Sequence, residues 1–355
     1  AKLANEALAV RGDDPKYSQK ELEIIQYGLD PDLYPDVDWQ DVLLNNSSWQ
    51  QTYYASAQGG GSVARYFISL NYSNESSAYK QDKNSRYFKD VAYNTFGIRA
   101  NIDMNLTKTT TLYFGVNANK TINNLPGSED TDKLWSACSK LTPLSIPVVY
   151  SNGMLPSASG TDDLASPYVN LNHTGLKTKD YTNSVYTLSI DQKLDMITKG
   201  LKLNVQGAYT SKEWFDETRK VVPELWYYDH RDANGNLAGT RQSVAQTVQY
   251  SKYQDLYRKY YLQATMTWSR QFADVHNFTA LAHYEMSDEK TASKSVDDGV
   301  ENSMLAIPVR YQGLSAKLGY NYNDLYMIDG NFGYTGSENF QSGNQFGFFP
   351  SISVG

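Results

Sequence analysis

Hydrophobic and polar residues alternate with a period of two over much of the chain after Trp49. In residues 96–106, six apolar side chains, from Phe96 to Leu106, alternate with five polar or small ones. Side chains of a β-strand point alternately to its two faces, so this pattern predicts a strand with one apolar face. A tilted strand of about eleven residues is long enough to cross the hydrocarbon core of a membrane. The same alternation recurs at 66–72, 112–119, 186–191, 201–206, 262–268 and 314–322.

The connections between these segments alternate between short and long, which is the organisation of an outer-membrane barrel with short periplasmic turns and long extracellular loops. Five tight turns are predicted at Gly59–Ser62, Thr107–Thr110, Met196–Gly200, Ala273–His276 and Asn323–Asp324. The long loops are expected near 75–91, 122–181, 215–245 and 289–307. Five hairpins give ten strands, and an eleventh begins at Phe346. Because an open sheet edge is costly in lipid, we expect the chain to be part of a longer barrel.

The first 48 residues follow a different pattern and are expected to form a loop and helical segment before the barrel strands of 49–355. Ser18 and Glu21 fit a capping box, in which each side chain bonds the backbone N–H of the other residue. Gly28 and Pro31 then supply stop signals, so a short helix is predicted over roughly 19–27. A second helical turn is expected between Val37 and Leu44.

Composition is compatible with both a membrane wall and a soluble protein. The 355 residues include 29 Tyr but only 12 Phe, and the Tyr ring with its polar tip suits a boundary between lipid and water. No apolar run reaches the roughly 18 residues of a transmembrane helix, whereas barrel strands have low average hydropathy. The net charge is −7 with scattered basic residues, which argues against nucleic-acid binding. The single Cys138 excludes an internal disulfide.

Several segments, in order along the chain, resemble the SusC/RagA family of TonB-linked outer-membrane transporters. They are residues 30–41 (DPDLYPDVDWQD), 59–70, 311–314 (YQGL), 320–326 (YNYNDLY), 331–340 (NFGYTGSENF) and 346–355 (FGFFPSISVG). The family often has a basic residue just before the last motif, where this chain has Asn344 and Gln345. That difference puts a basic luminal contact there in doubt.

The resemblance implies an all-β fold: a segment, in the first half, of a transmembrane antiparallel barrel of about 22 strands that encloses a plug. It further implies TonB-dependent import of oligosaccharides or peptides across the outer membrane of a Gram-negative cell. A SusD-like surface lipoprotein would cap the barrel as a lid, and membrane lipid would surround it. The plug and the TonB-contacting segment of the family lie upstream of the matching segments.

The best candidates for contact with a ligand or with the lid are four aromatic residues in the predicted extracellular loops, because binding hot spots favour Trp and Tyr. They are Trp135, Trp226, Tyr227 and Tyr228. The alternative is that these rings pack only within their own loop. No catalytic residue, cofactor or metal site is predicted, since no nucleophile elbow or P-loop motif is present. Acidic residues at 30–38 suit turns and helix caps better than calcium.

Two other classes of function remain open from the sequence. A passive porin would share the strand pattern but would lack a plug and a TonB-contacting segment. A soluble all-β binding module or adhesin would also use Tyr-rich strands and long loops. Such a module predicts strands of about five or six residues, and its loops would not be longer on one side.

Overall fold

A single antiparallel sheet accounts for most of the computed structural model, which describes residues 1–85, 91–128, 131–157, 165–293 and 308–355. Its eleven strands follow one another in chain order, so every neighbouring pair is antiparallel, and β5, β8 and β9 are left out of it. The strands are β1 (Gln50–Gly60), β2 (Ala64–Ser76), β3 (Ala92–Asn105), β4 (Thr110–Pro126), β6 (Gly175–Lys193), β7 (Leu201–Lys220), β10 (Gln249–Phe272), β11 (His276–Ser293), β12 (Val309–Tyr322), β13 (Tyr326–Ser337) and β14 (Phe346–Val354).

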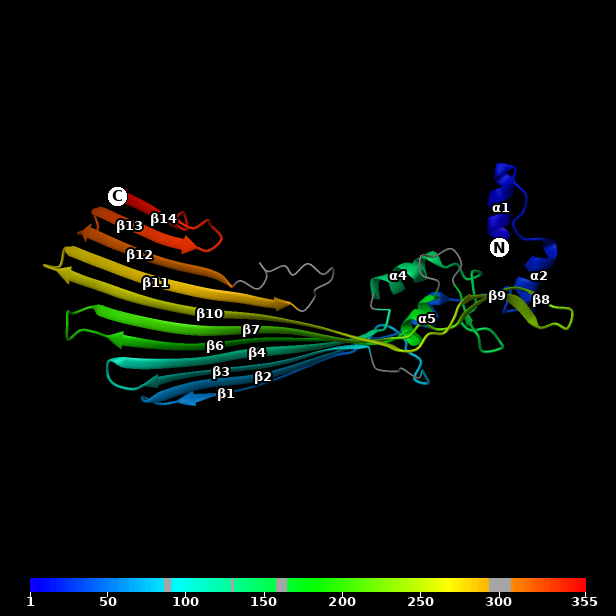
Figure 1. Cartoon of the computed structure of the whole chain (residues 1–355), viewed down its shortest axis with the longest axis horizontal. Helices are drawn as coiled ribbons and strands as arrows, with labels where there is room; N and C mark the ends of the chain where they lie inside the picture. Colours follow the sequence, from blue (N-terminus) through cyan, green and yellow to red (C-terminus); the bar gives the residue numbers. More distant parts are fainter. Residues whose placement is uncertain (86–90, 129–130, 158–164, 294–307) are drawn as a thin grey trace.

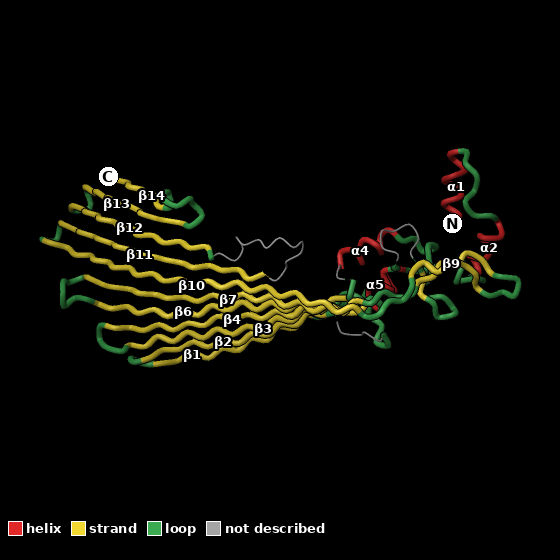
Figure 2. Tube along the Cα trace, in the orientation of Figure 1, coloured by secondary structure: helices red, strands yellow, loops and turns green. Residues whose placement is uncertain are grey.

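The helices and a small second sheet lie together at one end of the large sheet, opposite the end with the short turns (Figure 1, Figure 2). The small sheet has the order β5 (Leu155–Pro156), β8 (Leu225–Arg231) and β9 (Leu237–Ser243). The helices are α1 (Lys2–Arg11), α2 (Gln19–Tyr27), α3 (Trp39–Leu43), α4 (Thr131–Lys140) and α5 (Pro167–Asn172). Among the described residues, no helix is both long and apolar enough to cross a membrane.

The register of the strands gathers the apolar positions of the sequence on one face of the large sheet. One row of directly paired residues is apolar across ten strands: Ala64, Met104, Leu112, Ile190, Val205, Ala264, Tyr284, Leu314, Tyr334 and Phe348. The adjacent row, one residue along each strand, points to the other face and is mostly polar: Asp103, Tyr113, Ser189, Gln206, Gln263, Glu285, Gly313 and Thr335. The apolar face is the lipid-facing side of a barrel wall, and the polar face is the inner side.

Two belts of aromatic rings bound the apolar face. Near the loop end, the Tyr209 ring lies 6.2 Å from the Tyr186 ring and 5.0 Å from the Tyr260 ring, measured between centroids. Near the turn end, Trp268, Phe272, Phe278 and Tyr320 form a chain of ring contacts with centroids 4.9–6.4 Å apart. Along β10, the second belt lies about eight to twelve residues from Tyr260, which is a depth of roughly 20–30 Å for a tilted strand. This distance matches the apolar band of an outer-membrane barrel.

The five tight turns lie where the sequence predicts them, all at one end of the sheet (Figure 2). In two of them the chain reverses through consecutive residues of left-handed conformation: Ala273 and Asp274 have φ of 47° and 57°, and Asn323 and Asp324 have φ of 49° and 57°. Positive φ at two central residues gives a turn whose twist suits a hairpin. The sharp reversals keep this end of the wall free of long loops.

Several strands run further toward the loop end than the alternation of the sequence indicates. β4 continues to Pro126 and β6 begins at Gly175, which shortens the loop expected at 122–181 to the residues between them. β7 continues to Lys220, and β10 begins at Gln249. Beyond the lipid neither face has to be apolar, so the pattern fades while the backbone hydrogen bonds of the ladder continue. Of the loop expected at 289–307, residues 294–307 lie outside the described residues.

The N-terminal helices follow the local signals of the sequence. In α2, the Ser18 side chain accepts a hydrogen bond from the Glu21 backbone N–H, and Glu21 accepts one from the Ser18 N–H, which confirms the capping box. α2 ends at Tyr27, and the Gly28 that follows is left-handed with a φ of 58°. α3 is the second helical turn predicted in this region, and Asp38 caps it. α1, α4 and α5 were not expected from the pattern.

Candidate functional site

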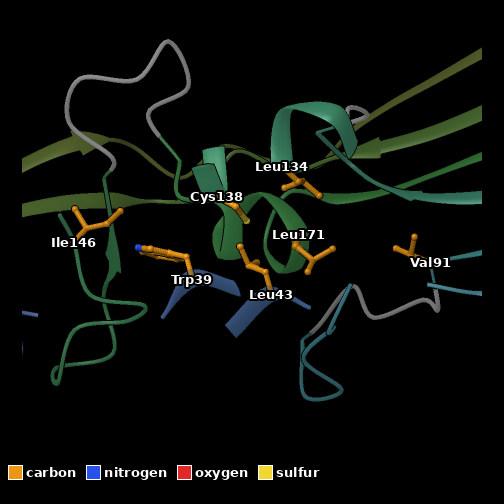
Figure 3. Close-up of a cluster of buried hydrophobic side chains, with 7 residues drawn as sticks. All are labelled: Trp39, Leu43, Val91, Leu134, Cys138, Ile146 and Leu171. Atoms are coloured by element: carbon orange, nitrogen blue, oxygen red, sulfur yellow. The ribbon is translucent and has the colours of Figure 1, made fainter. Parts of the chain in front are cut away.

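The loop end of the molecule has a hydrophobic core of its own. Trp39 and Leu43 of α3 pack with Leu134 and Cys138 of α4 and with Leu171 of α5, and each is at most 9% exposed (Figure 3). These helices come from the N-terminal segment and from the segment between β4 and β6. The described residues of 1–49, 127–174 and 221–248 are called the loop unit below. A shared core gives the loop unit a defined shape, which a set of separate loops would lack.

The β8 strand carries three of the four aromatic candidates. Leu225, which is 3% exposed, anchors the strand in the loop unit. Side chains alternate along a strand, so Trp226 and Tyr228 share one face of β8. Their rings are stacked with centroids 5.5 Å apart and planes 10° apart. Tyr227 points to the other face and is 37% exposed. The structure thus brings Trp226 and Tyr228 together and separates Tyr227 from them.

Residues of the segment between β4 and β6 hold this ring pair in place. The buried Tyr150 ring meets Tyr228 edge-on with centroids 4.7 Å apart. The Asn152 side-chain amide donates a hydrogen bond of 3.1 Å to the Tyr228 hydroxyl. The Trp226 Nε1–H donates one of 2.7 Å to Glu224 Oε1. With the polar tips bonded in this way, the orientation of the two ring faces is set before any partner binds.

An ion-pair cluster ties the β8–β9 hairpin to the N-terminal segment. The Arg231 guanidinium donates two hydrogen bonds to the Asp30 carboxylate, of 2.8 and 2.7 Å, and one of 3.1 Å to Asp32 Oδ2. Asp32 also accepts bonds of 2.7 and 2.6 Å from the Ser151 backbone N–H and hydroxyl. The hydrogen bonds from Arg231 hold the pKa of Asp30 below its ordinary value. Three segments that are distant in the sequence therefore meet at one charged cluster.

The fourth candidate, Trp135, lies apart from the other three. It is on α4 and is 53% exposed, and α4 and β8 occupy different parts of the loop region (Figure 1). Its neighbours Leu134 and Cys138 face the core of the loop unit, which leaves the Trp135 ring on the outer side of the helix. The four aromatic candidates therefore lie in three separate places, the Trp226–Tyr228 pair, Tyr227 and Trp135, and not in one site. Contact of any of them with a ligand or a lid remains a prediction.

Three of the four acidic residues of 30–38 have structural partners among the described residues. Asp30 and Asp32 bind Arg231, and Asp38 accepts hydrogen bonds of 3.0 and 3.1 Å from the backbone N–H groups of Gln40 and Asp41. In the described part of the chain, no three His, Cys, Asp or Glu side chains are grouped so that they could hold a metal ion. Asp38 therefore serves as the helix cap that the sequence suggested, whereas Asp30 and Asp32 belong to the cluster with Arg231.

Sequence reasoning overlooked Tyr150, Asn152 and Arg231, which position the aromatic pair and its hairpin. Asn152 lies in the sequence Ser151-Asn152-Gly153, which by itself indicates only a turn. Arg231 is 201 residues from Asp30, and neither residue carries a local signal of the other. Only the folded loop unit brings such residues together.

Comparisons with known proteins find likeness in structure and not in sequence. No family model matches the chain, and no curated protein matches it. A structure of the RagAB peptide transporter superposes with a TM-score of 0.61 at 13% identity, over 99% of this chain and 41% of that one. The RagAB peptide importer in its "open-open" state gives a TM-score of 0.58 at 14% identity, over 99% and 41%. Its "closed-closed" state gives 0.57 at 15% identity, over 91% and 36%.

This chain thus spans about two fifths of the chains that it matches. At such low identity the likeness establishes the fold, and it agrees with the resemblance to the SusC/RagA family read from the sequence motifs. The match runs along nearly all of this chain, so the strand order and the loop unit are both included in the comparison. The chain therefore has the fold of a segment of the wall of an outer-membrane, transmembrane antiparallel β-barrel.

Proposed function

We propose that this chain is part of a TonB-dependent importer of the SusC/RagA type in the outer membrane of a Gram-negative cell. The observation that carries the proposal is the apolar row that crosses ten strands without interruption, with a polar row directly beside it. A wall of this kind needs lipid on one side and an aqueous or protein-filled lumen on the other. The fold likeness to RagAB supports the assignment, and we assign no enzymatic step to the chain.

The partners follow from the same assignment. A SusD-like lipoprotein would sit over the loop unit, and TonB would engage a part of the protein outside these 355 residues. The cargo would be an oligosaccharide or a peptide, and the RagAB structures are described as those of a peptide importer. Trp135, Trp226, Tyr227 and Tyr228 are the proposed contacts with ligand or lid. Among these, Trp226 and Tyr228 are a stacked pair whose polar atoms are hydrogen-bonded.

The alternatives differ in measurable ways. A soluble binding module would have to leave Leu188, Leu262 and Leu314 in water, where they are 43–48% exposed on the same face. An apolar surface of this extent is a lipid or protein interface and not an ordinary solvated face. A passive porin remains the second candidate, because it shares this wall. Dependence of uptake on energy separates the two.

The test uses the full-length protein in its native cell. Membrane fractions should release it only with detergent, and uptake of its cargo should stop when TonB is deleted or a protonophore is added. A protein that is soluble without detergent would refute the membrane assignment, and uptake that continues without TonB would favour the porin. For the contact residues, a Trp226→Ala, Tyr228→Ala double variant should weaken cargo or lid binding. Leu237→Ala on the facing strand β9 serves as the control.

A further inference from the structure

Aromatic side chains also gather on the inner face of the wall, among its polar residues. On β10 the odd-numbered positions face inward, since Tyr260, Leu262 and Ala264 belong to the apolar outer face. Tyr257 and Tyr261 therefore point to the lumen. The unbroken register extends this assignment to neighbouring strands and places Tyr181 of β6, Trp214 of β7 and Tyr311 of β12 on the same inner face.

These five rings follow one another along the wall. Tyr181 pairs with Trp214 in the ladder, and their ring centroids are 5.1 Å apart. Trp214 pairs with Asp255, so Tyr257 is its diagonal neighbour at about 7–8 Å between backbones. Tyr261 follows about 13 Å further along the same strand. Tyr261 and Tyr311 both pair with Ser287, which puts them about 10 Å apart on either side of β11.

Carboxylates accept hydrogen bonds from the hydroxyl groups of two of the rings, Tyr257 and Tyr261. The Tyr257 hydroxyl donates a hydrogen bond of 3.0 Å to Glu289, and the Tyr261 hydroxyl donates one of 3.0 Å to Glu285. The Lys212 ammonium lies 5.1 Å from the Tyr257 ring centroid. Lys259 forms an ion pair of 2.5 Å with Glu289. The rings are therefore held at set orientations, with hydrogen-bond donors and acceptors on both sides of them.

The five rings begin above the membrane and continue down into the lumen. Tyr260 belongs to the aromatic belt near the loop end, which marks the upper edge of the lipid on β10. Trp214 and Tyr257 lie on the loop side of that level, and Tyr261 lies at it. A molecule leaving the loop unit would meet the rings in that order. The five rings therefore lie where cargo would enter the barrel from the loop side.

We propose that Tyr181, Trp214, Tyr257, Tyr261 and Tyr311 form a stacking track for a neutral oligosaccharide, a proposal that rests on the importer function above and names its cargo class. The apolar faces of sugar rings pack on aromatic faces. Successive aromatic rings along a wall can therefore bind an oligosaccharide at several positions. Binding that is shared over several weak contacts lets a cargo enter and also leave. The bonded hydroxyls and amines beside the rings can exchange hydrogen bonds with sugar hydroxyls.

Several of the charges beside the track are already paired, which favours a neutral cargo over a peptide. Glu289 is paired with Lys259, and Lys177 with Asp216, so these charges already have opposite partners. Glu285 accepts a hydrogen bond from Tyr261 and lies 3.8 Å from His283 Nε2. A peptide brings charged ends that would compete with these pairs, and leaving a partly buried charge unpaired is costly. A neutral polyhydroxylated chain leaves these ion pairs intact.

The test is calorimetric titration of the full-length protein, purified in detergent, with two probe sets. One set consists of neutral hexasaccharides from glucans, xylans and mannans, and the other of ten-residue peptides of mixed sequence. Trp214→Ala and Tyr257→Ala should each weaken oligosaccharide binding by about tenfold or more, whereas Trp214→Phe and Tyr257→Phe, which keep a ring, should stay within about threefold. Phe215→Ala is the matched control, because Phe215 is next to Trp214 but faces outward.

Heat-modifiable mobility on gels confirms that each variant barrel is folded. The track is refuted if no neutral oligosaccharide binds, if the two alanine variants bind it like wild type, or if peptides bind with the same dependence on the rings. These outcomes are distinct from failure of the importer proposal. Oligosaccharide binding that depends on the rings, together with uptake that does not depend on TonB, would sustain the track and reject energised import.

Discussion

Removal of the Arg231 side chain is the sharpest test of how the loop unit is assembled. In an Arg231→Leu variant, Asp30 and Asp32 lose their shared cation, and Asp32 is 6% exposed. Breaking a fully buried pair costs about 3–5 kcal/mol, whereas exposed pairs are worth about 0.2–1 kcal/mol. The Arg231 side chain is 35% exposed, so solvent screens part of the interaction and we expect a loss between these limits, about 2 kcal/mol.

The measurement is hydrogen exchange with peptide-level mass spectrometry on the full-length protein in detergent. A loss of about 2 kcal/mol corresponds to roughly 30-fold faster exchange in the segment around Asp30 and in the β8–β9 hairpin. The strands of the wall should exchange as in wild type, because their ladders do not depend on the cluster. Arg241→Leu on the same hairpin is the matched control, since Arg241 forms no ion pair among the described residues. Unchanged exchange near Asp30 in the Arg231→Leu variant would refute the reasoning.

The same cluster predicts the direction of a pH dependence. The Arg231 hydrogen bonds hold the pKa of Asp30 below its ordinary value, so the folded state favours the charged carboxylate. The resulting stabilisation is present above the ordinary Asp pKa of about 4 and is lost as the pH falls through the lowered value. Protection of the wild-type hairpin should therefore fall only below about pH 4 and approach that of Arg231→Leu. Loss of protection between pH 5 and 7 would contradict this assignment.

Three further substitutions test the wall and the loop core. Met266→Lys places a charge on the lipid face and should cost about 2–4 kcal/mol in urea refolding into bilayers, while Thr265→Lys on the inner face should be tolerated. Leu43→Ala, at a position that is 0% exposed, should cost about 2–5 kcal/mol and speed exchange throughout the core of the loop unit, unlike Leu29→Ala at 68% exposure. Gly175 has a φ of 95°, and an added Cβ would lie 1.9 Å from the Arg219 carbonyl oxygen. Gly175→Ala should therefore loosen the start of β6 from β7, seen as faster exchange there; wild-type exchange would be evidence against this close approach.

The sequence alone determined the wall, because a membrane imposes its pattern on each strand separately. In 96–106, lipid on one side requires an apolar residue at every second position, and this requirement can be read without knowing any partner strand. The turn at Asn323–Asp324 and the capping box of Ser18 and Glu21 are equally local. The distances involved are a few residues, so the signal and the structure coincide.

The tertiary structure alone decided how the loops come together and what lies on the inner face. Trp39 and Leu171 share a core, and Arg231 binds Asp30, which is 201 residues away in the sequence. No local sequence pattern predicts either contact. On the inner face, polar and aromatic side chains are both tolerated, since neither lipid nor a packed interior selects between them. The register of the strands is therefore needed to show that Trp214 and Tyr257 are neighbours. Lipid constrains each strand by itself, whereas loop packing and luminal chemistry depend on contacts between residues that only the fold makes adjacent.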